Sequence, residues 1–216
     1  SLYNFTVLFP LVIGSLTSIT VFAFVRVLGG TSAGLFAALI FSISVPIFSR
    51  GLIGWFKSEP LGLFLAFLAI YLFVSGFKYN KGKISLVKLI FAGIFLSLGL
   101  SAWGGVLFFV IPIILFYFTL PFLKSEQNFA LWAAPIFAAS LILSSLIFER
   151  TTTFFISFAA LAIILPTIFV VVSEIIKKFS NPSVKIRNCR IFLISIVLDL
   201  IRKAGEEVVG LGRSLT

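Results

Sequence analysis

The chain has 216 residues, of which 60% are hydrophobic and only 11% are charged, and its mean hydropathy is +1.21. A soluble domain carries roughly 25% charged residues, so this composition excludes an ordinary soluble domain. The net charge of +10 would suggest a nucleic-acid partner in a soluble protein. Here the positive charges lie in short loops between apolar runs, where they meet anionic lipid and set orientation. We therefore expect the lipid bilayer, and no nucleic acid, as the partner of this surface.

Apolar runs recur along the whole chain, and many approach the ~20 residues that a helix needs to cross the hydrocarbon core. They predict an all-α, polytopic transmembrane helix bundle with about eight apolar segments. The segments cover about Phe5 to Val25, Ala33 to Phe48, Leu61 to Phe77, Leu86 to Ala102, Val106 to Leu123, Phe129 to Phe148, Phe154 to Ile176 and Ile191 to Ile201. The eighth is short and ends at Arg202 and Lys203, so we expect it to span with tilt or to lie at the interface.

Residues 1–216 are expected to be one fragment of a transmembrane domain without a soluble domain. The longest polar stretch, Lys177 to Arg190, is too short to enclose a core. The chain does not begin with Met and has no signal-peptide pattern, so we expect an internal piece of a longer protein. The single cysteine, Cys189, excludes an internal disulfide, and the absence of His excludes a His ligand or base within this chain.

The Lys and Arg residues predict the orientation of the bundle. If the first segment runs from outside to inside, 11 of the 17 basic residues lie in inner loops, as the positive-inside rule requires. The loop from Ser49 to Pro60 then faces outward. We expect a multi-pass protein of the cell membrane with its active loop on the outer face.

Small residues predict where helices touch. Four of them recur at every fourth position along the fourth segment and would let a neighbouring backbone approach closely, and Gly30 and Gly34 repeat that spacing. The four are Gly93, Ser97, Ser101 and Gly105. Three prolines lie inside apolar runs, where a bundle tolerates kinks. They are Pro112, Pro135 and Pro166.

Two outer stretches carry side chains with chemistry. In the first, Arg, Lys, Glu, Trp and Gly crowd between two apolar runs from Ser49 to Pro60. Glu59 precedes Pro60, so it is expected at the N-cap or in the first turn of the next helix, where the helix dipole favours a carboxylate. The local sequence by itself favours a plain helix cap at Glu59. In the second stretch, Ser101 to Gly105, an indole and two glycines form a shallow niche, or an ordinary interfacial Trp beside a packing contact.

Together these stretches resemble the membrane domain of oligosaccharyltransferase catalytic subunits, most closely the archaeal type. That family carries Ser-Arg-x-x-x-Gly-x-x-Asp-x-Glu/Asp in an outer loop and a later Ser-x-Trp-Gly-Gly-like break, in the order found here. The matching residues are Ser49, Arg50, Gly54 and Glu59 in the loop, and Ser101, Trp103, Gly104 and Gly105 in the break.

The resemblance implies a GT-C-like membrane domain and en bloc transfer of an oligosaccharide. The donor is a polyprenyl (dolichyl-type) phosphate or pyrophosphate carrier, and the acceptor polypeptide presents the Asn of Asn-x-Ser/Thr. Mg²⁺ or Mn²⁺ is held by acidic residues of outer loops. By this resemblance Glu59 is the retained acid and metal ligand, and Arg50 orients it or the phosphate. Trp103, Gly104 and Gly105 line the path of the carrier.

One position departs from the family pattern. Lys57 stands where the family has the Asp that binds the metal directly, and an ammonium group has no lone pair to donate. Either Lys57 neutralises the carrier phosphate in place of the metal, or activity is weakened or lost. The family's acceptor-binding Trp-Trp-Asp-Tyr-Gly motif is not in this sequence, so we expect the piece to be catalytically incomplete.

Two other functions fit the same sequence features. One is a polyprenyl-phosphate-dependent transferase that moves a single sugar. The other is a non-catalytic paralogue, or a transporter-like scaffold, although transporters place charged residues and broken helices near the midplane and here the charges gather near the surfaces.

Overall fold

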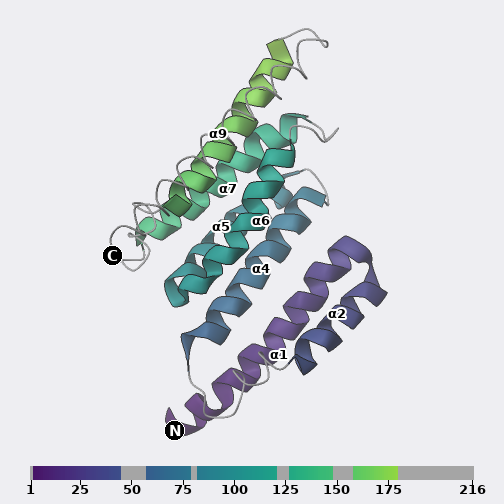
Figure 1. Cartoon of the computed structure of the whole chain (residues 1–216), viewed down its shortest axis with the longest axis vertical. Coiled ribbons are helices and arrows are strands. Elements are labelled where there is room, and N and C mark those ends of the chain that lie inside the picture. Colours follow the sequence, from purple (N-terminus) through teal and green to yellow (C-terminus); the bar gives the residue numbers. More distant parts are fainter. Residues whose placement is uncertain (1, 45–56, 79–81, 121–126, 148–157, 180–216) are drawn as a thin grey trace, which may run out of the picture.

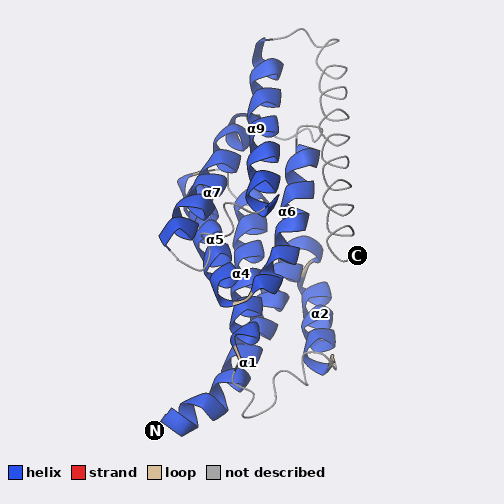
Figure 2. Ribbon diagram, turned by 60° about the vertical axis from the view of Figure 1, so that its left-hand side comes forward, coloured by secondary structure: helices blue, strands red, loops and turns tan. Residues whose placement is uncertain are grey.

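The computed structural model describes residues 2–44, 57–78, 82–120, 127–147 and 158–179. Within these ranges the chain forms seven α-helices and one 3₁₀ turn and contains no strand, which confirms the predicted all-α bundle (Figures 1 and 2). The helices are α1 (Leu2–Gly29), α2 (Thr31–Ile43), α4 (Ser58–Lys78), α5 (Lys83–Ala102), α6 (Leu107–Thr119), α7 (Gln127–Ile147) and α9 (Phe158–Phe179), with η1 (Gly104–Val106) before α6.

Each of the first seven predicted segments corresponds to one helix, and the eighth lies outside the described residues. Among the residues that the structure describes, three helical stretches are long and apolar enough to cross a membrane: Phe5–Gly29, Ser58–Lys78 and Lys83–Ala102. The 21 residues of α4 rise about 31 Å at 1.5 Å per residue, which matches the ~30 Å hydrocarbon core. α4 and α5 each therefore have one end at one surface of the bilayer and the other end at the opposite surface.

α1 and α2 form an antiparallel hairpin that turns at Gly30. The Gly30 N–H donates to the Arg26 carbonyl at 3.0 Å, and Gly30 has φ +89°, a conformation that favours glycine. A Cβ added to Gly34 would lie 2.9 Å from the Phe22 carbonyl oxygen. Gly34 therefore lets the two helices meet closely, and the predicted approach of a neighbouring backbone at this small residue is confirmed here.

α4 and α5 pack against each other along their whole length, because one stripe of α4 consists mainly of small buried residues. A Cβ on Gly62 would lie 2.7 Å from Cβ of Trp103, near the end of α5. At the other end, a Cβ on Gly76 would lie 3.1 Å from Cγ of Leu89. The stripe comprises Gly62, Ala66, Ala69, Phe73 and Gly76.

The small residues of α5 face α7. A Cβ on Gly93 would lie 2.0 Å from Ser140 Oγ and 2.8 Å from the backbone nitrogen of Leu141. Four residues later, the hydroxyls of Ser97 and Ser145 lie 3.2 Å apart and share a buried hydrogen bond. The predicted stripe is therefore a helix contact over its first half.

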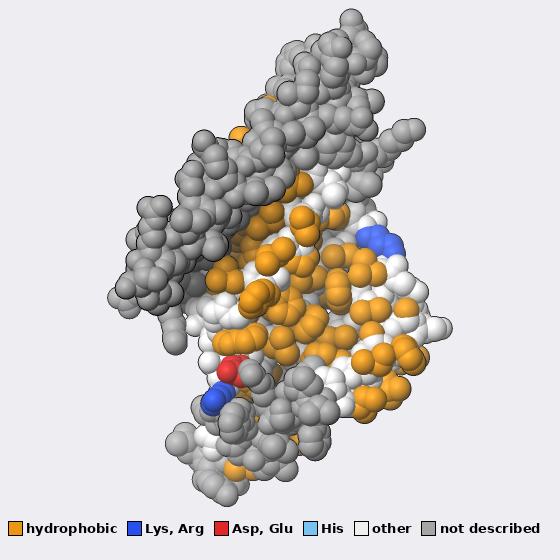
Figure 3. All heavy atoms as spheres, in the orientation of Figure 1, with side chains coloured by type: hydrophobic (Ala, Val, Ile, Leu, Met, Phe, Trp, Pro, Cys, Tyr) orange, Lys and Arg blue, Asp and Glu red, His pale blue; other side chains and the backbone are white. Residues whose placement is uncertain are grey.

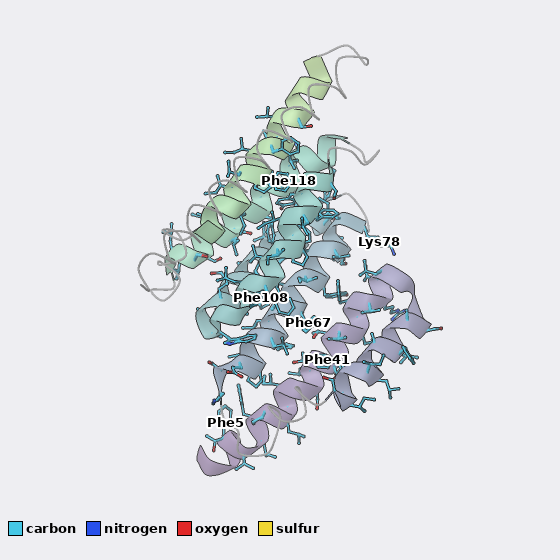
Figure 4. All side chains as sticks on the ribbon, in the orientation of Figure 1. Phe5, Phe41, Phe67, Lys78, Phe108 and Phe118 are labelled. Atoms are coloured by element: carbon cyan, nitrogen blue, oxygen red, sulfur yellow. The ribbon has the colours of Figure 1, made fainter. Side chains whose placement is uncertain are left out.

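An aromatic cluster joins α4, α6 and α7. The Phe73 ring lies 4.9 Å from Phe137 and 5.5 Å from Phe116, both edge-on, and Phe137 and Tyr117 are fully buried. A second series of edge-on rings, Phe41–Phe67–Phe109, joins α2 to α4 and α6 (Figure 4). Edge-on pairs contribute about 0.5–1.5 kcal/mol each beyond area burial, so these rings hold together helices that have few polar contacts.

The outer surface of the bundle is apolar. Hydrophobic side chains cover most of the described face in Figure 3, and its charged side chains lie near the edges. Phe36 is 64% exposed and Phe108 74% exposed. In water such a surface would aggregate, whereas in a bilayer it is the surface that lipid tails solvate.

Basic side chains gather at the end of the bundle where α1 and α4 finish and α5 begins. The Lys78 ammonium group donates to the Val27 carbonyl at the end of α1 (Figure 4), and Lys88 donates to Ser75 Oγ at 2.9 Å. Lys83 opens α5 at the same end. We call this the basic end; the start of α4 lies at the opposite end.

Prolines interrupt four of the helices. Pro10 lies inside α1, Pro112 inside α6, Pro135 inside α7 and Pro166 inside α9. The three that the sequence placed inside apolar runs are confirmed as helix-interior residues. In α4, Pro60 occupies the first turn, where its missing N–H costs nothing.

Candidate functional site

The outer-loop stretch enters the described structure at its last residues. Lys57 is exposed and comes directly before α4, and Glu59 lies in the first turn of that helix, partly buried. The predicted position of Glu59 is therefore confirmed. The first N–H groups of a helix have no acceptor within it and carry partial positive charge, which favours a carboxylate there. Arg50, with Ser49 and Gly54, lies outside the described residues.

The second stretch is a sharp break between two helices. α5 ends at Ala102, and Trp103 adopts an extended conformation with φ −151° and ψ 123°. Its N–H still donates to the Gly99 carbonyl at 2.9 Å, while its own carbonyl accepts from the Val106 N–H at 3.1 Å. Trp103 therefore caps α5 and precedes η1, and four residues, 103–106, carry the chain from α5 into α6.

Glycines on both sides of Trp103 make this geometry possible. A Cβ on Gly105 would lie 2.3 Å from the indole ring, so the ring covers Gly105 directly. A Cβ on Gly62 would lie 2.7 Å from Trp103 Cβ and 3.4 Å from its backbone nitrogen. Around Gly104 nothing lies within 4 Å of such a Cβ, so the turn is open at that one position.

These contacts bring the two predicted stretches to one end of the bundle. Glu59 precedes Gly62 by three residues, and residues three apart share one face of a helix. Glu59 therefore lies about one helical turn before Gly62, at the same end of α4 as the Gly62–Trp103 contact. This end, opposite to the basic end, contains Lys57, Glu59, Trp103 and the Gly104–Gly105 turn; we call it the site end.

Gly62 and Gly99 are residues of this end that the sequence did not single out. A signal for Gly62 was present, because it begins the small-residue stripe of α4 and follows Glu59 by one helical turn. The sequence alone does not say that Trp103 is the neighbour, since that depends on the register between α4 and α5.

Charge at the site end is sparse. Among the residues whose side chains the structure describes, Glu59 is the only acidic one. Figure 3 shows an acidic and a basic side chain next to each other at the lower-left edge of the apolar face. A carboxylate accepts hydrogen bonds, an ammonium group donates them, and the opening N–H groups of η1 are further donors. Such an end can hold a polar group that carries both donors and anionic oxygens.

The described part of this end does not form a divalent-metal site on its own. Mg²⁺ takes several oxygen ligands at once, and the described ranges contain no group of three His, Cys, Asp or Glu residues. Lys57 adds a positive charge two residues from the one carboxylate.

Comparison with known proteins agrees with the family resemblance found in the sequence. The family model described as "Oligosaccharyl transferase STT3, N-terminal" matches residues 1–212. A curated relative, the "Dolichyl-diphosphooligosaccharide--protein glycosyltransferase subunit STT3B" of Arabidopsis thaliana, is 32% identical over 94 residues. Those residues are 44% of this chain and 12% of the relative, so the match spans a small part of that protein's length. The family match covers nearly the whole chain, and the chain therefore belongs to the oligosaccharyl transferase STT3 family.

Proposed function

We propose that this chain forms the membrane part of an enzyme that transfers an oligosaccharide en bloc from a polyprenyl-type phosphate carrier to the Asn of an Asn-x-Ser/Thr acceptor. The observation that supports it most is the contact of Gly62 with Trp103, which brings the start of α4, with Glu59 in its first turn, to the same end of the bundle as the Trp103–Gly105 break, in a chain of the STT3 family. The archaeal-type subunit remains our suggested subgroup.

The site end faces outward in this proposal. Arg26, Lys78, Lys83 and Lys88 lie at the basic end, and the positive-inside rule assigns that end to the cytoplasm. Because α4 and α5 each span the hydrocarbon core, Glu59 and Trp103 then lie at the outer surface. A lipid carrier embedded in the outer leaflet would present its phosphate at this depth.

In the proposed reaction, the acceptor amide nitrogen attacks C1 of the first sugar. The new N–C1 bond forms as the bond from C1 to the phosphate oxygen breaks, and the carrier phosphate leaves with the electron pair. Glu59 accepts a hydrogen bond from the amide N–H, which weakens its conjugation with the carbonyl, and takes the proton. Arg50 orients Glu59 or the phosphate, and the indole of Trp103 and the open turn at Gly104 and Gly105 line the path of the carrier.

The role of Lys57 determines whether transfer needs a metal ion. In the first form of the proposal its ammonium group neutralises the leaving phosphate, and transfer needs no Mg²⁺ or Mn²⁺. In the second, activity depends on an Asp that this chain lacks, and the protein is a weakened paralogue. The first form is the one we propose, because Lys57 is exposed directly before α4 and an ammonium group can neutralise an anionic phosphate oxygen but cannot bind a divalent cation.

The test uses the protein as encoded, in nanodiscs, with a lipid-linked oligosaccharide and a fluorescent Asn-x-Thr peptide. Glu59→Gln should lower transfer by about 100-fold or more, because a positioned carboxylate contributes typically 10²–10⁴-fold. Glu174→Gln is the matched control, since Lys177 and Lys178 follow Glu174 at helical spacing, and it should transfer normally. Equal activity of the Glu59 variant and wild type, or a product bearing one sugar, would overturn the proposal.

A second arm tests Lys57. Wild-type transfer should be the same with Mn²⁺ and with EDTA, and Lys57→Asp should make transfer depend on Mn²⁺. Wild-type transfer that stops in EDTA would refute the phosphate-neutralising role of Lys57 and restore the metal.

A further inference from the structure

We propose that Gly62 is a positioning residue of the transfer site. Through its contact with Trp103 it fixes the distance between the Glu59 carboxylate on α4 and the carrier-lining turn at Gly104. This inference rests on the proposed function and deepens it, because Gly62 itself touches neither substrate.

Gly62 and Trp103 approach each other very closely. A Cβ on Gly62 would lie 2.7 Å from Trp103 Cβ, 3.4 Å from the Trp103 backbone nitrogen and 3.5 Å from the Gly99 carbonyl oxygen. Real Cβ atoms essentially never approach within 3.0 Å. Trp103 Cβ cannot swing away as a side-chain tip can, because it is attached to the backbone that caps α5. Any side chain at position 62 must therefore move the backbone of Trp103 or separate the two helices.

A movement of Trp103 is transmitted to the turn that follows it. The indole of Trp103 covers Gly105, and the Trp103 carbonyl accepts the hydrogen bond that begins η1. A displaced Trp103 therefore displaces the turn that opens α6. Glu59 is anchored on α4, one turn before Gly62, so it does not follow. The two halves of the proposed site separate by the same amount.

Gly76 provides a matched control within the same helix. Gly76 lies on the same stripe of α4 and packs against the same helix, but at the basic end. A Cβ on Gly76 would lie 3.1 Å from Leu89 Cγ and 3.3 Å from the Ser85 carbonyl oxygen. Larger residues at Gly62 and Gly76 disturb the same helix pair, and only the first disturbs the site end.

The experiment compares Gly62→Val and Gly76→Val in the protein at its full encoded length. The variants are reconstituted in nanodiscs, and kcat is normalised to the amount of folded protein. We expect Gly62→Val to lower kcat by about 10- to 100-fold, since a displacement of 1 Å costs about 10²-fold, with the acceptor KM changed less than about twofold, because the contact aligns bound groups. Gly76→Val should lose thermal stability and keep kcat within about twofold. The smaller change Gly62→Ala should also lower kcat. In a Trp103→Gly background its Cβ keeps only the position-103 nitrogen at 3.4 Å and the Gly99 carbonyl oxygen at 3.5 Å as near neighbours, so Gly62→Ala should have little further effect on kcat there.

The outcomes separate the two proposals. If wild type transfers oligosaccharide and Gly62→Val has the same kcat, or if Gly76→Val loses as much kcat, Gly62 has no positioning role. An additive effect of Gly62→Ala in the Trp103→Gly background also refutes it. Absence of transfer by wild type overturns the proposed function itself.

Discussion

The contact of α5 with α7 yields the prediction with the clearest magnitude. In the Gly93→Ala variant the new Cβ would lie 2.0 Å from Ser140 Oγ, 2.8 Å from the Leu141 backbone nitrogen and 3.1 Å from the Phe137 carbonyl oxygen. Ser140 Oγ can rotate away at the cost of its hydrogen bond to the Phe137 carbonyl at 2.8 Å. The Leu141 nitrogen is backbone, and α7 must retreat for the Cβ to reach ordinary contact.

Such overpacking costs about 1–3 kcal/mol in a well-packed interior. We expect the free energy of unfolding of Gly93→Ala to fall by that amount relative to the matched variant Gly14→Ala. Gly14 lies in the interior of α1 with nothing within 4 Å of an added Cβ, so the comparison removes the helix propensity that alanine gains over glycine. The measurement is reversible unfolding in mixed micelles, titrated with SDS and followed by circular dichroism.

A second background identifies the obstructing atom. Ser140→Gly removes Oγ but leaves the Leu141 nitrogen and the Phe137 carbonyl in place, so at least half of the Gly93→Ala penalty should persist there. If Gly93→Ala and Gly14→Ala unfold with free energies within about 0.5 kcal/mol of each other, a typical limit for neutral changes, the close approach of α5 and α7 is refuted.

Three further predictions concern the turn, the polar contact and the orientation. Gly30→Ala should lower the unfolding free energy by about 1–3 kcal/mol through backbone strain alone, since open space surrounds an added Cβ; an unchanged SDS midpoint contradicts this. Ser97→Ala should cost less than about 1 kcal/mol in the same titration, as interhelical hydrogen bonds average about 0.6 kcal/mol, and a larger loss would show a stronger polar contact. In a Cys189→Ser background, Ser58→Cys should react with an impermeant maleimide on intact cells and Lys83→Cys only after permeabilisation; the reverse pattern would place the site end in the cytoplasm.

The sequence predicted the helices well because apolar runs of bilayer length have few alternatives to a helix. It placed helix ends less well, since hydrogen bonding continues past the apolar run. α5 begins at Lys83, for example, where the predicted segment began at Leu86. A lysine at a helix end extends its charge to the interface, so hydropathy does not mark the true start.

The predicted small-residue stripe illustrates a second limit. Gly93 and Ser97 contact α7, as a stripe should, whereas Ser101 donates to the Leu98 carbonyl of its own helix and Gly105 lies under the ring of Trp103. The spacing is regular, but α5 ends at Ala102, so the last position, Gly105, lies in η1 and not on α5. Spacing identifies a smooth face and gives neither its partner nor its end.

At the candidate site, too, local features could be predicted from the sequence and the contact between helices could not. The break at Trp103 and the first-turn position of Glu59 could be predicted, because glycine pairs and a Glu-Pro step have strong local meaning. Their contact through Gly62 could not, because it depends on how two helices slide along each other. The roles of Glu59, Lys57, Trp103, Gly104 and Gly105 in transfer remain predictions, and so does that of Arg50.

The distribution of prolines divides the bundle mechanically. Helices with an interior proline lack one backbone hydrogen bond and bend there at low cost; α1, α6, α7 and α9 are of this kind. α4 and α5 have no interior proline and lock together at both ends. Glu59 and the Trp103 break therefore lie on the pair of straight helices, so bending at a proline of α1, α6, α7 or α9 would leave the spacing between Glu59 and Trp103 unchanged.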